Sequence, residues 1–313
     1  MLEWLLEGDP VIQYKVYKEL LQDESKLEDI QNQMLKEGWV KEYLSKRNEH
    51  GHWGNKFYHP KWTCSHYTLM DLCLFAAPCT PEIMATINKI ADENKSPDGG
   101  INPHTELQKS DVCINGMFLD YACYFGIKEE KLHSVVDFVI SQAMADGGFN
   151  CRLNRSGAKH SSVHTTIAML EGIERYKTKG YRYRLDELLK LQTSSESFLL
   201  DHHLFKSDKT GEIIHPSFTV FTYPWRWKYN VLRAMYYFAS ADRPYDKRMD
   251  DALDLIESKA KKGKWPVRSK HPGQVHLVLE APRTMSRMST IMALVVLSRY
   301  KKSQQWLANV LKL

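Results

Sequence analysis

The sequence contains no apolar run that approaches the roughly 20 residues of a membrane span, so we expect no membrane-spanning helix. It has no basic stripe of a nucleic-acid-binding module, because its longest basic cluster, residues 259–264, is interrupted and its net charge is only +5. Residues 1–9 carry acids and no basic region, which predicts no signal peptide. The six cysteines lack the spacing of a disulfide framework. We therefore expect a cytoplasmic protein with reduced thiols that binds no nucleic acid.

A repeat organises the 313 residues, of which 43% are hydrophobic and 11% aromatic. A glycine-containing turn recurs at 51–54, 98–100, 146–149, 209–211 and 263–265. After each turn come a polar loop and then an apolar segment with helical spacing. These segments begin near Trp62, Ser110, Ser161, Trp225 and Thr284. The period of about 50 to 60 residues leaves room for two helices and their loops in each repeat.

The apolar segments are hydrophobic nearly all round, as helices buried on both sides should be, whereas stretches such as 128–144 and 245–259 are amphipathic. The sequence therefore predicts an all-α fold, an α/α toroid of about five helical-hairpin repeats with inner and outer helices. We expect residues 49–313 to form this toroid and residues 1–48 to form an N-terminal helical cap, in one compact domain. A linear helical solenoid is the alternative architecture.

In a closed ring the inner helices run parallel, so their N-termini gather at one mouth and favour anions and thiolates there. The first residues of neighbouring inner helices include Asp111, Cys113 and His164. Asp, Cys and His are common zinc ligands, and three of them at the same depth can converge on one ion. The alternative is that Cys113 is a buried thiol, Asp111 a helix cap and His164 a core histidine.

Two consecutive stretches resemble a known family. The Asp-Gly-Gly turn that precedes Asp111-Val-Cys113, and the Gly-Gly-Phe turn that precedes His164-Thr165, are similar to two repeats of protein prenyltransferase β subunits, closest to the Rab geranylgeranyltransferase type. This resemblance covers residues 98–172. The chain as a whole resembles uncharacterised bacterial proteins labelled squalene-cyclase-like.

The resemblance implies that Asp111, Cys113 and His164 hold Zn²⁺ and leave a fourth position for a thiolate substrate or water. Cys151, just after the second turn, is a possible fourth ligand, and with it the zinc would be structural. The chain also departs from the family. Thr105 and Gln108 stand where the family has an Arg and a Lys that hold a diphosphate, and the Asp-x-Asp-Asp motif of squalene cyclases is missing.

Aromatic and basic residues at the starts of the inner helices suit a cavity for an apolar or isoprenoid molecule. The predicted cavity residues are Trp62, His66, Tyr67, Trp225, Arg226, Trp227, Arg283 and Arg287. The first hypothesis is a zinc-dependent, prenyltransferase-like enzyme whose metal activates water or the thiolate of a peptide or protein. The second is a non-catalytic binding protein with a structural zinc. The third is a metal-free terpenoid cyclase or carrier.

The string Asp250-Asp251-Ala-Leu-Asp254 matches the aspartate-rich motif of metal-dependent terpene synthases. It falls within an amphipathic segment, however, so we expect it to be a solvated outer face of a helix.

Overall fold

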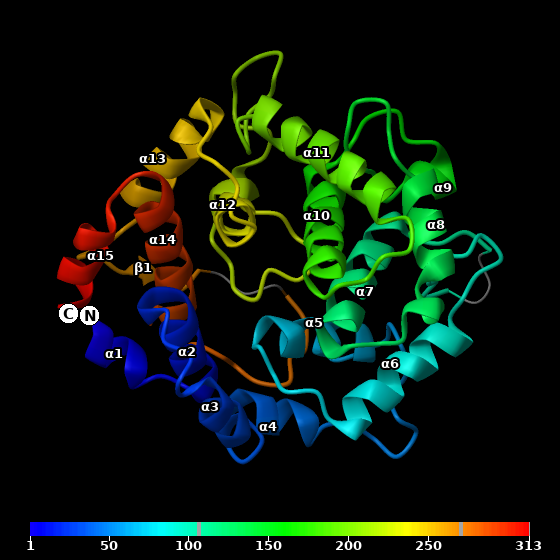
Figure 1. Ribbon diagram of the computed structural model, residues 1–313, viewed down its shortest axis with the longest axis horizontal. Coiled ribbons are helices and arrows are strands. Elements are labelled where there is room, and N and C mark those ends of the chain that lie inside the picture. Colours follow the sequence, from blue (N-terminus) through cyan, green and yellow to red (C-terminus); the bar gives the residue numbers. More distant parts are fainter. Residues whose placement is uncertain (105–107, 269–271, 313) are drawn as a thin grey trace.

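The computed structural model describes residues 1–104, 108–268 and 272–312, and the chain is mostly helical there. Its helices are arranged around a common centre, and the two chain ends lie close together (Figure 1). The helices nearest the centre are α2 (Pro10–Lys15), which continues into the π-helix η1 (Val16–Leu21), α5 (Ser65–Leu74), α7 (Val112–Phe125), α10 (Val163–Thr178), α12 (Val231–Ser240) and α14 (Arg287–Tyr300).

A second set of helices lies farther from the centre in Figure 1. It comprises α3 (Leu27–Met34), α6 (Pro81–Glu93), α8 (His133–Ser141), α11 (Leu185–Asp201), α13 (Asp250–Ser258) and α15 (Gln304–Leu311). The sequence explains the two positions. In α7, 11 of the 14 residues are buried, whereas α13 buries only three of its nine and turns its acids outward, so α7 needs neighbours on all sides.

The remaining elements are short. They are α1 (Leu2–Leu6), α4 (Gly38–Leu44), α9 (Leu153–Ser156), the 3-10 helices η2 (Glu129–Lys131), η3 (Pro216–Thr219) and η4 (Lys247–Met249), and the strands β1 (Trp265–Pro266) and β2 (Met285–Ser286). The two strands pair antiparallel just before α14, with Trp265 opposite Ser286. No helix in the described part of the chain is long and apolar enough to cross a membrane.

The N-terminal residues contribute to the wall around the centre. Asp9 caps α2 by accepting a hydrogen bond from the Val11 N–H (3.0 Å), and its second oxygen accepts one from the Trp39 N–H at the start of α4 (2.8 Å). Farther along, Lys15 donates a hydrogen bond to the hydroxyl of Tyr236 on α12 (3.3 Å). Part of the segment 1–48, expected to cap the ring, therefore lies beside the central helices.

The glycine turns have a shared structural role. In or directly after four of the turns, a backbone N–H donates to a polar side chain near the start of a central helix: Trp53 to Ser65 (3.1 Å), Ile101 to Asn115 (2.7 Å), Phe149 to Thr166 (3.1 Å) and Trp265 to Thr290 (3.1 Å). In two of these turns an aspartate also binds the following loop. Asp98 accepts from the N–H of Ser110 (2.7 Å), and Asp146 accepts from the N–H of Ser161 (2.7 Å).

Helices α7 and α10 pack backbone to backbone through two glycines. A Cβ added to Gly116 would lie 2.8 Å from the carbonyl oxygen of Ala168 and 2.9 Å from the N of Met169. A Cβ on Gly172 would overlap the carbonyl oxygen of Gly116. Only glycine at both positions allows this approach, so these residues set the spacing of the two helices.

Candidate functional site

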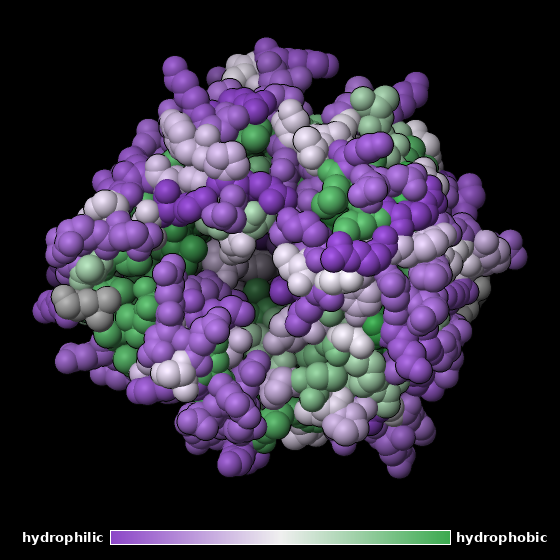
Figure 2. All heavy atoms as spheres, viewed as in Figure 1, coloured by the Kyte–Doolittle hydropathy of each residue, from purple (hydrophilic) through white to green (hydrophobic). Residues whose placement is uncertain are grey.

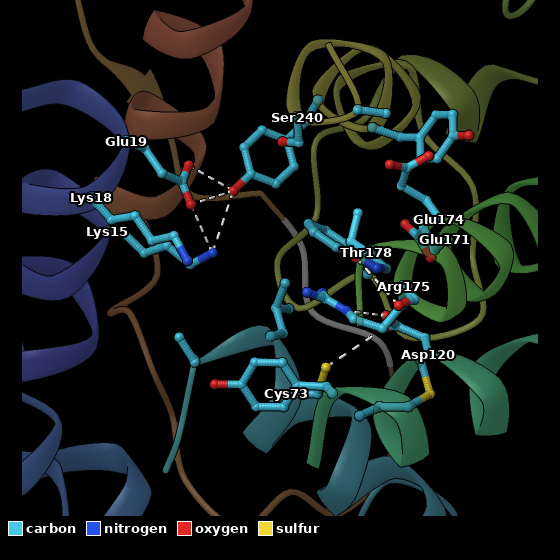
Figure 3. Close-up of a pocket in the computed structure, with 18 of the residues that line it drawn as sticks. Lys15, Lys18, Glu19, Cys73, Asp120, Glu171, Glu174, Arg175, Thr178 and Ser240 are labelled. Atoms are coloured by element: carbon cyan, nitrogen blue, oxygen red, sulfur yellow. Dashed lines mark hydrogen bonds and ion pairs between the residues drawn. The ribbon is translucent and has the colours of Figure 1, made fainter. Parts of the chain in front are cut away.

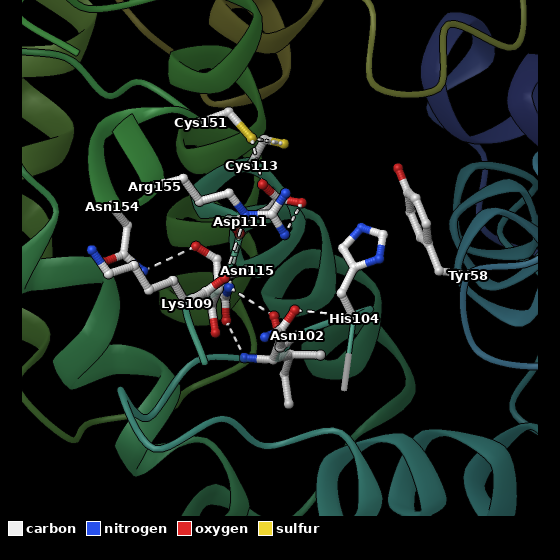
Figure 4. Close-up of polar contacts among 12 residues, drawn as sticks. Tyr58, Asn102, His104, Lys109, Asp111, Cys113, Asn115, Cys151, Asn154 and Arg155 are labelled. Carbon is white, nitrogen blue, oxygen red and sulfur yellow. Dashed lines mark hydrogen bonds and ion pairs between the residues drawn. The ribbon is translucent and has the colours of Figure 1, made fainter. Parts of the chain in front are cut away.

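Asp111 and Cys113 lie together at the start of α7, as the sequence predicts, and Cys151 lies against both (Figure 4). The sulfur of Cys151 is 2.8 Å from the sulfur of Cys113 and 3.5 Å from Oδ1 of Asp111. The other carboxylate oxygen of Asp111 forms an ion pair with Arg155 on α9 (3.0 Å). Burial raises the pKa of Asp111, although the neighbouring Arg155 opposes the shift. Its carboxylate is thus already neutralised by a cation.

His164, the third predicted ligand, makes a different set of contacts. Its Nδ1 accepts a hydrogen bond from the backbone N–H of Tyr229 (2.8 Å), and its ring packs against Phe218 and Trp227 (centroids 5.3 and 5.2 Å apart). Burial, together with nearby Arg233, lowers its pKa to about 4, so the ring is neutral at pH 7. A neutral imidazole that accepts at Nδ1 carries its proton on Nε2, and then neither nitrogen is free to bind a metal.

The three-ligand zinc set implied by the family resemblance therefore does not fit this arrangement. Among the described residues, no group of three or more His, Cys, Asp or Glu side chains is placed to hold a metal ion. Two residues stand where the prenyltransferase family has the basic residues that hold a diphosphate. Gln108 is exposed, and Thr105 lies outside the described residues.

Five of the other predicted cavity residues contact one another, namely Trp62, His66, Tyr67, Arg226 and Trp227. Trp62 and Tyr67 form a small buried cluster with Cys64, and Arg226 caps it by donating a hydrogen bond to the carbonyl of Trp62 (3.0 Å). His66 is fully buried between aromatic rings.

Arg226 and Trp225 also line the central cavity, and Trp227 packs both against the Trp62–Tyr67 cluster and on the ring of His164. Arg283 is exposed, and Arg287 lies over the ring of Trp4 in a second cavity of about 470 Å³. The predicted residues therefore lie mainly around Trp62 and Tyr67, whereas Arg287 lies in a different cavity.

A cavity of about 540 Å³ lies among the central helices, where the molecular surface is hollowed (Figure 2). Most of its lining comes from α2, η1 and the later turns of α5, α7, α10 and α12, and Trp225 and Arg226 come from the segment before α12. Apolar and aromatic side chains such as Met70, Met117 and Tyr124 contribute, but charged groups are frequent. The charged residues that line it are Lys15, Lys18, Glu19, Asp71, Asp120, Glu171, Glu174, Arg175 and Arg226.

Two of the lining residues form a buried ion pair. Arg226 lies 3.1 Å from Asp71, with side-chain exposures of 4% and 2%. The hydroxyl of Tyr43 donates a second hydrogen bond to the same carboxylate (3.1 Å). Burial raises the pKa of Asp71 to about 6, despite the opposing effect of Arg226. The cavity lining therefore holds a carboxyl group that can change protonation near neutral pH.

The walls carry further pairs on opposite sides (Figure 3). On η1 and the end of α2, Lys15 donates to Glu19 (2.9 Å). Across the cavity, Arg175 on α10 donates to Asp120 on α7 (2.9 Å).

Lys18 also lines the cavity and is exposed, and it forms no ion pair within the described residues. Its ammonium group lies over the ring of Tyr14, 5.7 Å from the centroid. Partial burial lowers the pKa of Lys18, and repulsion from Lys15 and Arg175 adds to the effect.

The sequence interpretation missed this cavity although a signal was present. Asp71, Asp120, Glu171 and Arg175 are charged residues in the second halves of segments that are otherwise apolar. A charge on a buried helix needs a partner or a function.

No protein-family model matches this chain, and no curated protein matches it. The assignment of a function consequently depends on the geometry of these sites.

Proposed function

We propose that this chain is an α/α toroid of about five helical hairpins whose central cavity binds a small polar molecule with an anionic group. The repeat is supported by the four equivalent hydrogen bonds from a glycine turn to a central helix. The buried character of the central helices supports the ring. The cavity volume of about 540 Å³ is within the range of small-molecule sites.

The observation that carries the proposal is the convergence of cations from opposite walls. Lys15 and Lys18 approach from η1 and α2, and Arg175 approaches from α10 (Figure 3). Lys15 is offset by Glu19 and Arg175 by Asp120, whereas Lys18 forms no ion pair among the described residues.

Partial burial lowers the pKa of Lys18, and repulsion from Lys15 and Arg175 adds to this effect. Glu19 and Glu24 oppose it. An anion placed beside Lys18 would offset the repulsion.

The polarity of the walls also favours a hydrophilic ligand over a bare isoprenoid chain. A hydrocarbon in this cavity would displace water from charged side chains without replacing their hydrogen bonds, which costs free energy. Tyr14 and Tyr124 also line the cavity, but Lys18 lies over the ring of Tyr14 and Arg175 over the ring of Tyr124 (5.7 and 5.2 Å to the centroids). The ligand class that we propose is therefore a small phosphorylated or carboxylated molecule with a hydroxylated body.

The proposal can be tested by calorimetric titration of the protein with inorganic phosphate, with glucose 6-phosphate and with glucose. Glucose serves as the uncharged control for its phosphate. We expect the phosphorylated sugar to bind and glucose to bind at least tenfold more weakly. Lys18→Ala should raise the Kd roughly tenfold or more, because a hydrogen bond to a charged group contributes about 1.5–3 kcal/mol.

Lys128→Ala, which removes an exposed lysine away from the cavity, is the matched control and should leave the Kd unchanged. Equal binding of glucose and its phosphate, no binding of either anion, or a Kd unaffected by Lys18→Ala would contradict the proposal.

The zinc-dependent, prenyltransferase-like activity implied by the resemblance stays a prediction. It requires about one zinc per chain and a reorientation of His164 away from the Tyr229 N–H. Elemental analysis of protein purified without chelator tests it.

A further inference from the structure

We propose that Cys113 and Cys151 are a redox-active dithiol that forms a reversible disulfide and fastens the loop containing α9 to the start of α7. Their sulfurs are 2.8 Å apart, and both side chains are partly exposed, so a small oxidant can reach them. The other cysteines differ. Cys64, Cys73 and Cys123 are buried, and the exposed Cys79 has its sulfur 3.7 Å from the carbonyl of Thr80.

The surrounding contacts hold the two sulfurs in place before any bond forms. The N–H of Cys151 donates to Thr165 Oγ1 on α10 (3.0 Å), which fixes one end of the loop. On α9, Arg155 pairs with Asp111 (3.0 Å) and Asn154 donates to the carbonyl of Ser110 (3.1 Å). Since a disulfide is about 2.05 Å long, the sulfurs need to approach by less than about 1 Å.

A metal is the competing explanation for two thiols beside a carboxylate. The contacts argue against it, because Asp111 is engaged by Arg155 and His164 accepts the Tyr229 N–H. The sulfurs, moreover, are closer together than two ligands of one tetrahedral zinc, since two bonds of about 2.3 Å place their sulfurs roughly 3.7 Å apart. The pair is therefore arranged for bond formation between its members rather than around an ion.

The reaction balances with a low-molecular-weight disulfide as oxidant. The thiolate of one cysteine attacks the oxidant's disulfide and releases one thiol, and the second cysteine then displaces the other. The two protein thiols lose two protons and two electrons, and the oxidant becomes two thiols. A dithiol reductant reverses both steps. The product links residues 38 positions apart, which restricts the unfolded chain and raises the thermal midpoint of the oxidised form.

The test uses full-length Cys79→Ser protein, which lacks the exposed thiol, incubated with glutathione disulfide and then alkylated. We expect loss of two alkylatable thiols, an intact mass lower by two hydrogen atoms, and one cross-linked peptide pair containing Cys113 and Cys151. Dithiothreitol should restore both thiols. Cys113→Ser and Cys151→Ser should each abolish the cross-link, whereas Cys123→Ser should not.

Three results would overturn the proposal. The first is a stable glutathione adduct on Cys151 with Cys113 still free. The second is a cross-link that excludes either residue. The third is a metal, found by elemental analysis, that must be chelated before the thiols oxidise. The number of alkylatable thiols can also be counted in the wild-type protein before and after oxidation. The test therefore remains valid if one of the cysteine variants fails to fold.

Discussion

Replacing Gly116 by alanine should destabilise the protein by about 1–2 kcal/mol, although alanine is the better helix former. The added Cβ would lie 2.8–2.9 Å from three backbone atoms of Ala168 and Met169 on α10. Backbone in the middle of a buried helix cannot rotate away, so α7 and α10 must separate. Overpacking of this kind costs about 1–3 kcal/mol, and the gain in helix propensity is at most about 1 kcal/mol.

Urea unfolding followed by circular dichroism measures this cost as a lower midpoint at an unchanged slope. Gly172→Ala should behave alike, because its Cβ would meet the carbonyl of Gly116 across the same contact. The double variant should lose less stability than the sum of the two single variants, since the first substitution already opens the space for the second. A midpoint for Gly116→Ala equal to or above that of the wild type would refute the reasoning.

Three further outcomes follow from individual side chains. Burial lowers the pKa of His66 to about 3, so as the pH falls the unfolded chain takes up a proton on this histidine before the folded protein does. Below about pH 6.5 the free energy of unfolding should therefore fall by up to about 1.4 kcal/mol per pH unit. His66→Phe should flatten this pH dependence of the urea midpoint. Asp250→Asn with Asp251→Asn should change stability by less than about 1 kcal/mol, because the ion pair of Asp251 with Lys206 (2.7 Å) is partly exposed; loss of a bound Mg²⁺ would contradict this. Asp98→Asn should cost about 1–2 kcal/mol at pH 7, since hydrogen bonds lower the pKa of Asp98 despite its partial burial. In unfolding curves this cost should begin to shrink below about pH 4 and disappear only once the pH has fallen past the lowered pKa of the folded state.

The helices could be predicted because their signals are local. Apolar segments expected to begin near Ser110 and Ser161 become α7 and α10, which start at Val112 and Val163. The glycine turns could be recognised by their recurrence, and Gly99 and Gly147 do adopt positive φ angles of 88° and 93°. In each case, a few neighbouring residues determine the structure.

The sites depend on contacts between distant residues, and these were harder to predict. Asp111 and Cys113 could be placed together because they share one helix start. The direction of the His164 ring could not, because it is set by Tyr229, which lies 65 residues later. Likewise, the contribution of Lys15 to the central cavity depends on Tyr236, 221 residues away. Spacing within one segment contains no information on such pairings.

The contact between Gly116 and Gly172 also bears on the proposed ligand site. The ion pair of Asp120 with Arg175 joins the same two helices about one turn farther along, and it spans part of the cavity wall. A separation of α7 and α10 by a Cβ would lengthen or reorient this pair and so move a cation that we assign to anion binding. Gly116→Ala should therefore weaken the binding of a phosphorylated sugar as well as the fold, whereas Lys18→Ala should weaken binding alone, because Lys18 is exposed and forms no ion pair among the described residues. If both variants retain wild-type affinity, the cavity is not the binding site, even where the stability cost of Gly116→Ala is as calculated.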